Sequence, residues 1–418
     1  MGTINLFIID MSFADNISGV DRYISTLLKG LEEYPFISTH WIHLCLDKTT
    51  LFHTEEQSAY FTKITIPLPQ QYYEIINERF WIRRYNEQIY RISKHLFQNK
   101  QNCILHLHTL NLIDLAIYIR KQVCCKIITH LHCIPWKGYY NSNMYKFNSL
   151  YSLYYLNNSV PLKNSDFITN NCELQSYTDT DHVICVTKCA VNYLKRITNL
   201  DDCKISVIPN GINDLFYLDS ISPYKDKDNS FKILYVGVLS ESKGLDYILK
   251  AVRKVVQCGY HISLTIAGKS INGMAESIEK KNQDLELNLL GKIPFDKLHA
   301  YYKHSDVGII ASLQEQSSYV AIEMAMFGLP VIATAVDGLD EMFTDNINSM
   351  KVDTVFSKLK GLYVDVDMMS DKIITLIEDK GLRNELSLNI RALYKQKYTL
   401  QRMVQQTISI YQYIIRRN

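Results

Sequence analysis

The sequence predicts an α/β protein with two doubly wound parallel sheets in series. Apolar, strand-like runs alternate with helical periodicity along the chain, and this pattern restarts after a polar segment at 218–230. The length of 418 residues suits two domains of similar size. Because parallel strands are buried on both faces, the alternation of strands and helices indicates sheets that are covered by helices on each side.

The first half of the chain carries the first of these patterns. The runs expected as strands are 4–10, 39–46, 63–68, 103–109, 125–133, 182–186 and 204–211. Apolar residues recur at helical spacing over 18–34 and 74–97, so both segments are expected to be amphipathic helices. We assign 1–208 to an N-terminal Rossmann-like domain.

The second half repeats the pattern. The runs expected as strands are 231–239, 261–268, 285–291, 307–312, 330–334 and 359–365. Helical periodicity fills the intervals, and 209–398 is assigned to a C-terminal Rossmann-like domain, while 399–418 is expected to be a helix that crosses back to the first domain. Ligands of doubly wound sheets bind at the carboxyl ends of the strands, so the two domains are expected to face an interdomain cleft.

Charge and cysteine content limit the partners and the cellular location that can be expected. Lysine and arginine total 45 against 43 acidic residues, which gives no electrostatic reason to expect a nucleic-acid partner. The ten cysteines include no Cys-x-x-Cys pair, as is typical of reduced thiols in a cytosolic protein. The first residues resemble a buried strand and not a signal peptide. We expect a cytoplasmic protein, with the inner face of the membrane as an alternative location and the oligomeric state open.

Two carboxylates mark the expected ligand site of the second domain. Glu315 lies in the loop after the strand 307–312, and Glu323 lies eight positions later in the following helix. A carboxylate at Glu323 could accept from the two hydroxyls of a ribose, and Glu315 could accept from a sugar hydroxyl. The alternative is that both are solvated surface glutamates.

The start of that helix is a candidate anion site. Ser317 or Ser318 suits the N-cap, and the amides of the first turn then lack intrahelical partners. Those amides belong to Ser318, Tyr319 and Val320, and they could bind a diphosphate without a metal ion. The serines could equally serve only as caps.

Other loops at strand ends add further candidates. Lys243 precedes a helix after the strand 231–239, where an ammonium group can meet phosphate. In the first domain, Gly19 would allow close approach of the backbone to a ligand, and Arg22 could face either the cleft or solvent. Two histidine pairs, His106 with His108 and His130 with His132, end neighbouring strands.

Each histidine pair has both members on one face of its strand, because side chains alternate. Four histidines invite a metal interpretation, but no carboxylate or cysteine pattern accompanies them, so no metal is expected. One or two are expected to be core residues, and one at a strand end could reach substrate.

The ordered set of motifs resembles the family 4 glycosyltransferases of the GT-B fold, a retaining class that uses nucleotide-activated sugars. The resemblance extends over nearly the whole chain. The matching segments are Glu315 to Glu323, which is similar to the family's E-x7-E motif, and the segments 18–23, 207–213, 236–244 and 398–411.

The resemblance implies roles for individual residues. Glu323 would hold the nucleotide ribose, Glu315 would contact the transferred sugar, and Lys243 with the amides after Ser317 would hold the diphosphate. Gly19 would approach the diphosphate from the first domain. His132 best matches the family's histidine near the reacting sugar, with His130 as second candidate. The donor would be a UDP- or GDP-sugar, and no metal or other cofactor is implied.

Two departures from the family pattern leave questions open. The family's phosphate-side arginine is Val238 in this chain, and the usual Glu-Gly-Phe-Gly turn reads Glu315-Gln316-Ser317-Ser318. The acceptor stays open between a glycan, a lipid-linked sugar and a peptide. A non-catalytic, sugar-nucleotide-binding partner subunit of the same fold is the alternative to a transferase.

Overall fold

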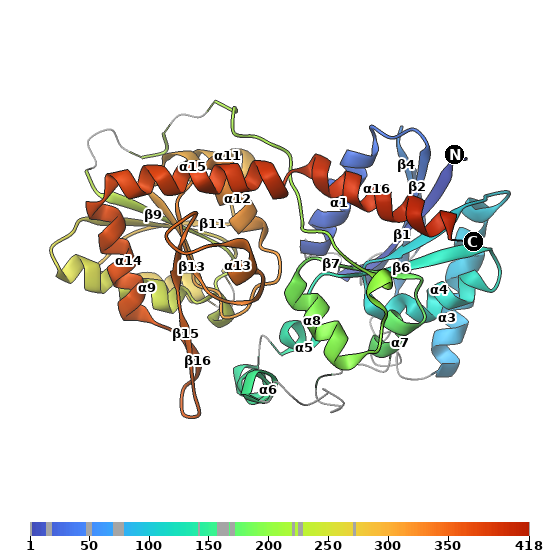
Figure 1. Ribbon diagram of the computed structural model, residues 1–418, viewed down its shortest axis with the longest axis horizontal. Helices are drawn as coiled ribbons and strands as arrows, with labels where there is room; N and C mark the ends of the chain where they lie inside the picture. Colours follow the sequence, from blue (N-terminus) through green and yellow to red (C-terminus); the bar gives the residue numbers. More distant parts are fainter. Residues whose placement is uncertain are drawn as a thin grey trace. The chain divides into compact units, whose positions relative to one another are not determined.

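The structure is a computed structural model that describes residues 2–13, 19–46, 52–69, 79–140, 143–156, 167, 172–219, 222–224, 229–270 and 273–417. The chain divides into two compact units (Figure 1). Unit 1 contains 1–136, 160–211 and 400–418, and unit 2 contains 137–159 and 212–399.

Unit 1 is an eight-stranded sheet in the order β3-β4-β2-β1-β5-β6-β7-β8. Its strands are β1 (Ile4–Phe13), β2 (Ile37–Leu46), β3 (Thr54–Gln57), β4 (Phe61–Leu68), β5 (Cys103–Leu107), β6 (Cys125–Leu131), β7 (His182–Cys185) and β8 (Ile205–Val207). All neighbouring strands pair in parallel except β3 with β4. The strand order reverses between β1 and β5, so this is where a doubly wound sheet opens a ligand site.

Helices cover the unit 1 sheet. They are α1 (Gly19–Leu31), α3 (Arg79–Ser93), α4 (Ile113–Arg120), α7 (Glu173–Thr178), α8 (Lys188–Ile197) and α16 (Leu400–Arg416). One sheet face packs Phe7, Ile9 and Met11 of β1 into a buried apolar cluster that includes residues of α3 and α4. Helix α16 packs closely on α1, since a Cβ atom on Gly30 would lie 2.3 Å from Val404 Cγ2.

Unit 2 contains a six-stranded parallel sheet in the order β11-β10-β9-β12-β13-β14 and a separate antiparallel hairpin of β15 and β16. Its strands are β9 (Phe231–Val236), β10 (Ile262–Ala267), β11 (Glu286–Gly291), β12 (Val307–Ile310), β13 (Val331–Thr334), β14 (Met350–Val352), β15 (Thr354–Ser357) and β16 (Gly361–Val364). The strand order reverses between β9 and β12, which places the expected ligand site at the carboxyl ends of these two strands.

The helices of unit 2 follow the predicted alternation with its strands. They are α6 (Met144–Leu156), α9 (Leu245–Gln257), α10 (Met274–Lys281), α11 (Phe295–His304), α12 (Tyr319–Phe327), α13 (Asp337–Met342), α14 (Val366–Glu378) and α15 (Lys380–Lys397). The predicted fold class, α/β with two Rossmann-like doubly wound domains, is therefore confirmed.

The segment after β6 differs from the predicted domain boundaries. The sequence placed everything up to 208 in the first domain, but the structure groups 137–159 with unit 2. The contacts that hold this segment involve residues about 200 positions later, including an ion pair between Lys137 and Asp337 and a hydrogen bond from the Leu362 amide to Asn148. No local pattern in the sequence reports such contacts.

Among the described residues, no helix is both long and apolar enough to cross a membrane.

Candidate functional site

The expected donor site lies at the carboxyl edge of the unit 2 sheet, where β9 and β12 part. The loop after β9 reaches the 3-10 turn Glu241–Lys243, and the loop after β12 carries Glu315. Lys243 Nζ lies 2.5 Å from Glu315 Oε2, so the two loops are joined by an ion pair. The Leu313 amide also donates to the Ser242 carbonyl over 2.9 Å. The structure thus brings together two candidates that are 72 positions apart.

Glycines allow the loops at this edge to approach closely. Gly244, which precedes α9, has φ +70°, and a Cβ atom there would lie 2.0 Å from the Ala311 carbonyl oxygen. Gly268, after β10, would place a Cβ atom 1.7 Å from the Gly237 carbonyl oxygen. A side chain at either position would force the strand ends apart, which explains the glycine after Lys243.

The N-terminus of α12 is capped by one of the two serines that the sequence offered. Ser318 is the N-cap, and its Oγ accepts from the Ala321 amide over 3.2 Å. Tyr319 and Val320 then occupy the first two positions of the helix, whose amides have no intrahelical acceptor in any α-helix. This end of the helix carries a partial positive charge, and it directly follows the loop that contains Glu315.

Glu323 lies inside α12 and is buried, with 2% of its surface exposed. Its Oε2 accepts a hydrogen bond from the Tyr302 hydroxyl over 2.6 Å. A buried carboxylate is stable only when it is hydrogen-bonded. Tyr302, on α11, is a residue that the sequence gave no reason to single out.

Two further contacts steady the loop of Glu315. Its carbonyl oxygen accepts from the Gly338 amide over 2.9 Å, at the start of α13. The neighbouring Asp337 has a φ of +41° and forms an ion pair with Lys137, and each of these side chains is 2% exposed. Tyr235 lies near the end of β9, and burial, followed by the charge of Glu315, raises the pKa of its phenol. Sequence reasoning missed all three side chains, and the only signal was the charge of Lys137 beside Trp136 in an aromatic run.

Val238, at the position of the family's arginine, is 39% exposed, and its carbonyl oxygen accepts from the Tyr235 hydroxyl. The loop is therefore held by its backbone, and the side chain provides no charge.

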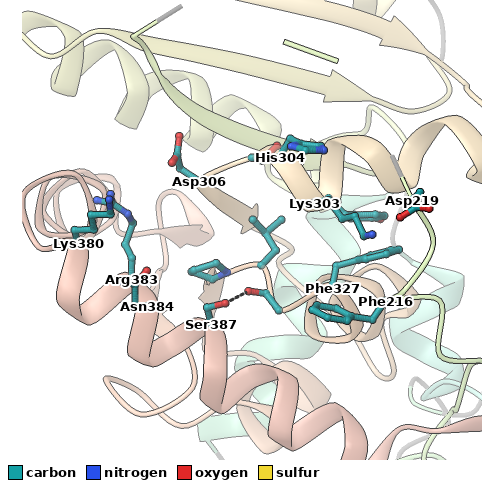
Figure 2. A pocket seen from close by; sticks show the side chains of 15 residues that line it. Phe216, Asp219, Lys303, His304, Asp306, Phe327, Lys380, Arg383, Asn384 and Ser387 are labelled. Carbon is teal, nitrogen blue, oxygen red and sulfur yellow. Dashed lines mark hydrogen bonds between the residues drawn. The ribbon is translucent and has the colours of Figure 1, made fainter. Parts of the chain in front are cut away.

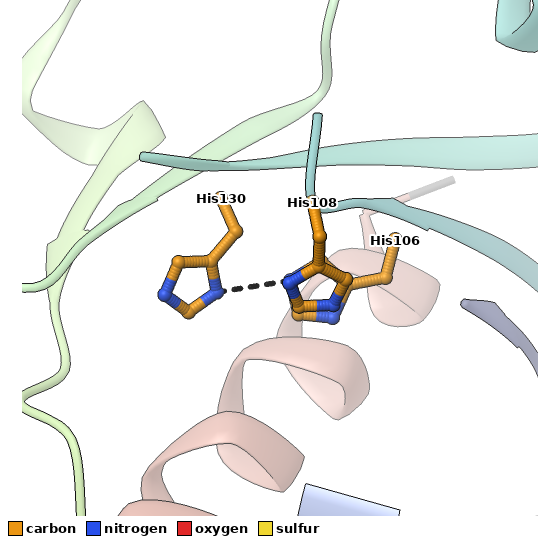
Figure 3. A group of neighbouring side chains, drawn as sticks. All are labelled: His106, His108 and His130. Atoms are coloured by element: carbon orange, nitrogen blue, oxygen red, sulfur yellow. Dashed lines mark hydrogen bonds between the residues drawn. The ribbon is translucent and has the colours of Figure 1, made fainter. Parts of the chain in front are cut away.

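The four candidate histidines of unit 1 form one group at the carboxyl ends of β5 and β6, and Figure 3 shows His106, His108 and His130 of this group. His106 Nε2 lies 3.2 Å from His130 Nδ1, and His108 Nδ1 lies 2.9 Å from His132 Nε2. His106 Nδ1 also lies 2.7 Å from the hydroxyl of Tyr411 on α16. The predicted placement of each pair on one strand face agrees with these contacts.

The four rings differ in their access to solvent. His106, His108 and His130 are buried, whereas His132 is half-buried at the end of β6. Burial lowers the pKa of His106 and His132 to about 3 and the pKa of His108 and His130 well below the ordinary value. Each ring is therefore neutral at pH 7, and His132 is the member that a ligand could reach.

Three of these rings also have the spacing of a possible metal site. His106, His108 and His130 each place one ring nitrogen within 4.8 Å of the others. The group contains no carboxylate to offset the charge of a divalent ion in a buried site, which makes such a site costly. The expectation of no metal thus stays a prediction.

Paired aspartates are a second possible source of metal ligands. Asp-x-Asp triplets, which could place two carboxylates on an ion, occur at 179–181, 226–228 and 365–367, and 226–228 lies outside the described residues. Asp181 accepts from the Ile127 amide, Asp365 caps α14 by accepting from the Met368 amide, and Asp367 pairs with Lys254. These contacts give two of the triplets structural roles.

The remaining candidates of unit 1 lie at the start of α1. Gly19 is its first residue and is exposed, and a Cβ atom there would meet nothing within 4 Å. Arg22 is half-buried one turn further along. Tyr23, a residue the sequence did not single out, is buried and contacts His130 and His132 edge-on at centroid distances of 4.5 and 4.9 Å.

A cavity of about 610 Å³ lies elsewhere in unit 2 (Figure 2). Its walls include Asp306, which directly precedes β12, and the residues from Phe327 to Pro330, which directly precede β13. These positions are the amino ends of the strands. Because doubly wound sheets bind ligands at the carboxyl ends, the donor site is expected at the edge of Lys243 and Glu315 and not in this cavity.

Comparison with known proteins agrees with the two units. The model for glycosyl transferases group 1 matches residues 219–393, and the model for glycosyltransferase family 4 matches residues 17–214. An uncharacterised glycosyltransferase of Methanocaldococcus jannaschii is 27% identical over 252 residues, which are 57% of this chain and 62% of that protein. The GPI3 subunit of phosphatidylinositol N-acetylglucosaminyltransferase from Saccharomyces cerevisiae is 28% identical over 240 residues, 56% of this chain and 50% of that protein. The matches thus span about half to three-fifths of these relatives.

Solved structures share the fold over the full chain. Sucrose-phosphate synthase from Thermosynechococcus elongatus superposes with a TM-score of 0.74 at 16% identity, covering 99% of this chain and 100% of that one. Anabaena HepE in complex with UDP gives a TM-score of 0.69 at 14% identity, covering 98% and 100%. The fold is the GT-B fold of these glycosyltransferases, and the two family models match one unit each. More particularly, the chain is similar to the family 4 glycosyltransferases, as its motifs indicated.

Proposed function

We propose that the chain is a retaining, metal-independent hexosyltransferase that moves a sugar from a UDP- or GDP-sugar to a glycan, lipid-linked or peptide acceptor. The observation that carries the proposal is the Lys243–Glu315 ion pair at the reversal point of the unit 2 sheet, beside the capped end of α12. A cation, a helix N-terminus and a carboxylate are the groups that a diphosphate and a sugar hydroxyl require.

Donor binding would exchange partners within this site. Lys243 leaves Glu315 for the diphosphate, which carries more negative charge than a single carboxylate. Glu315 then has a free oxygen for a hydroxyl of the transferred sugar. Glu323 would take the ribose, which requires Tyr302 to share or release its carboxylate. By the family resemblance, His132 would act near the reacting sugar and Gly19 near the diphosphate.

The proposed chemistry needs no base from the protein. The bond between the anomeric carbon and the phosphate oxygen breaks, and the acceptor oxygen bonds to the same face of that carbon. The acceptor's proton passes to the leaving phosphate oxygen. Lys243 and the amides of the first turn of α12 stabilise the charge that develops on the diphosphate, which is where preorganised donors contribute most.

The alternative is a sugar-nucleotide-binding partner subunit without activity. It is favoured by one observation, that Val238 gives the phosphate side no charge where the family has an arginine. Incubation of the purified chain with a panel of UDP-, GDP- and ADP-sugars distinguishes the two. Transfer to an acceptor or hydrolysis of the donor supports the transferase, whereas donor binding without turnover supports the subunit.

A location at the membrane face is part of the proposal only for a lipid-linked acceptor. The GPI3 subunit of yeast belongs, by its name, to an enzyme that acts on phosphatidylinositol.

A further inference from the structure

Helix α6 and the β15–β16 hairpin of unit 2 expose apolar side chains in two segments that contain no acidic residue, although Asp337 pairs with the buried Lys137 and Asp353 and Asp365 flank the hairpin. The segments 135–156 and 354–364 contain four lysines and no aspartate or glutamate, although the whole chain is nearly balanced in charge. The most exposed large apolar residues of these segments are Tyr139, Tyr145, Leu153, Val355 and Leu359. Apart from Lys137, whose ion pair with Asp337 lies beside the Glu315 loop, both segments lie outside the site described above.

The helix and the hairpin form one structural piece. Asn148 of α6 accepts from the Leu362 amide over 2.9 Å. The next-door Gly361 has a φ of +72°, and a Cβ atom there would lie 2.0 Å from Asn148 Nδ2, so only glycine allows this contact. Tyr151 stacks on Phe356 with a centroid distance of 5.6 Å. The two elements therefore present their outer residues together.

The inner and outer faces of α6 are clearly separated. Phe147, Leu150 and Tyr154 are buried, and the contacts with the hairpin come from Asn148 and Tyr151. The outer stripe runs through 145, 149 and 153, which are four positions apart and share one helix face. Tyr145 is 87% exposed and Leu153 is 40% exposed.

The tip of the hairpin also exposes an apolar side chain, and it does so between two lysines. Leu359 is 93% exposed between Lys358 and Lys360, which are exposed as well. A leucine at the end of a two-stranded hairpin projects from the surface, so it cannot line a pocket for a small ligand. An apolar side chain flanked by two cations is instead suited to a surface that is anionic outside and apolar beneath.

We propose that this α6–hairpin surface, defined by Tyr145, Leu153, Lys358, Leu359 and Lys360, binds an anionic membrane surface. Leu359 would enter the boundary between headgroups and acyl chains, and the lysines would meet lipid phosphates. Tyrosine is enriched at membrane interfaces because its ring is apolar and its hydroxyl is polar. Each lysine near an anionic bilayer contributes about 1 kcal/mol.

Other occupants fit the surface less well. A second copy of the chain would bring lysines against lysines. A small acceptor would need a concave site, whereas the hairpin tip is convex. The inference rests on the proposed function in one respect, because membrane binding suits a transferase with a lipid-linked acceptor. Its test, however, needs neither donor nor acceptor. Its failure and that of the proposed activity are therefore distinguishable.

The test is co-sedimentation of the full chain with vesicles of phosphatidylcholine containing 30 mol% phosphatidylglycerol, compared with phosphatidylcholine alone. We expect binding to the anionic vesicles that weakens in 0.5 M salt. Because a factor of about 5 corresponds to each lysine, Lys358→Gln with Lys360→Gln should lower the partition coefficient about 30-fold. Leu359→Ser should lower it further.

Matched controls lie on the same unit. Leu388 is a 73% exposed leucine on α15, and Lys280 and Lys281 are adjacent exposed lysines on α10. Leu388→Ser and the Lys280→Gln, Lys281→Gln pair should leave vesicle binding within about twofold of the original protein. Tryptophan at 359, introduced as Leu359→Trp, should be quenched by brominated lipid, and Leu388→Trp should not.

Three results would overturn the inference. The first is an original protein that stays in the supernatant with anionic vesicles. The second is a control pair that loses as much binding as the hairpin pair. The third is a dimer in solution that the Leu359→Ser substitution dissociates, because the surface would then bind a second copy.

Discussion

Lys243 Nζ and Glu315 Oε2 lie 2.5 Å apart and join the loops that follow β9 and β12. The lysine side chain is 36% exposed and the glutamate 16%, so a ligand at the sheet edge can reach both. In the protein without ligand, each charge is satisfied by the other. A diphosphate must therefore compete with Glu315 for Lys243. Removal of the Glu315 charge should then leave the affinity for a diphosphate unchanged or raise it.

Substitution of Glu315 should separate binding from turnover. Glu315→Gln removes the competing charge, so the free nucleoside diphosphate should bind as tightly as before or more tightly. Donor hydrolysis or transfer should fall by about 10²–10³, the effect of losing one group that stabilises the transition state. Calorimetry with the diphosphate and a rate with the donor measure the two effects. Weaker diphosphate binding with an unchanged rate would contradict the assigned role.

Glu323 is tested together with its partner Tyr302. Glu323→Ala should weaken binding of the nucleoside diphosphate about 10- to 150-fold, because hydrogen bonds to a charged group contribute roughly 1.5–3 kcal/mol. Tyr302→Phe keeps the carboxylate and removes only the 2.6 Å hydrogen bond, so it should lower stability by about 1.5–3 kcal/mol with little effect on affinity. If both variants lose only stability and bind normally, Glu323 is a structural residue.

Chelation tests the absence of a metal. Donor turnover should be the same with and without EDTA, because Lys243 and the α12 amides take the place of a divalent ion at the diphosphate. The rate is measured after dialysis against EDTA and again after manganese is added. Activity that disappears with EDTA and returns with manganese would show that the phosphate site is wrongly assigned, and the Asp-x-Asp triplets and the histidine group would then be examined as ligands.

The buried histidines should make stability depend on pH. Their pKa is lowered in the folded protein, to about 3 for His106 and His132, so the unfolded chain binds more protons below its ordinary pKa of about 6.5. Stability should therefore be complete above pH 6.5 and fall by about 1.4 kcal/mol per pH unit for each such histidine as the pH decreases toward 3.

Urea unfolding between pH 7.5 and 5.0 measures this slope. His106→Gln should reduce the slope by about one proton, and it keeps a polar group opposite the Tyr411 hydroxyl. A free energy of unfolding that is flat over this range would mean that the rings already accept protons in the folded state.

Periodicity and loop chemistry predicted much of this molecule. The central strands of both sheets, the cap at Ser318 and the position of Lys243 before a helix all depend on neighbours within a few residues, so the local sequence records them. β3, β14 and β15 were not predicted, because they have only three or four residues each and all four residues of β3 are polar or charged.

What the sequence could not predict depends on distant partners. Nothing near Lys137 indicates that it pairs with Asp337, and nothing near Asn148 indicates that it holds the hairpin at Gly361. The grouping of 137–159 with unit 2 follows from these contacts. The Lys243–Glu315 pair also depends on distant partners. The sequence indicates each residue separately as a ligand-binding candidate, and only the folded chain places them together.

The most direct test of the central claim is one calorimetric titration. UDP, GDP and ADP are titrated in EDTA into the original chain and into Lys243→Ala, with Lys292→Ala as a control lysine that follows the outer strand β11 at the same edge of the sheet. We predict that one of these nucleotides binds the original chain and the control at one site, and that Lys243→Ala binds it at least tenfold more weakly. If no nucleotide binds, or if Lys243→Ala binds as tightly as the control, the donor site proposed between β9 and β12 is contradicted.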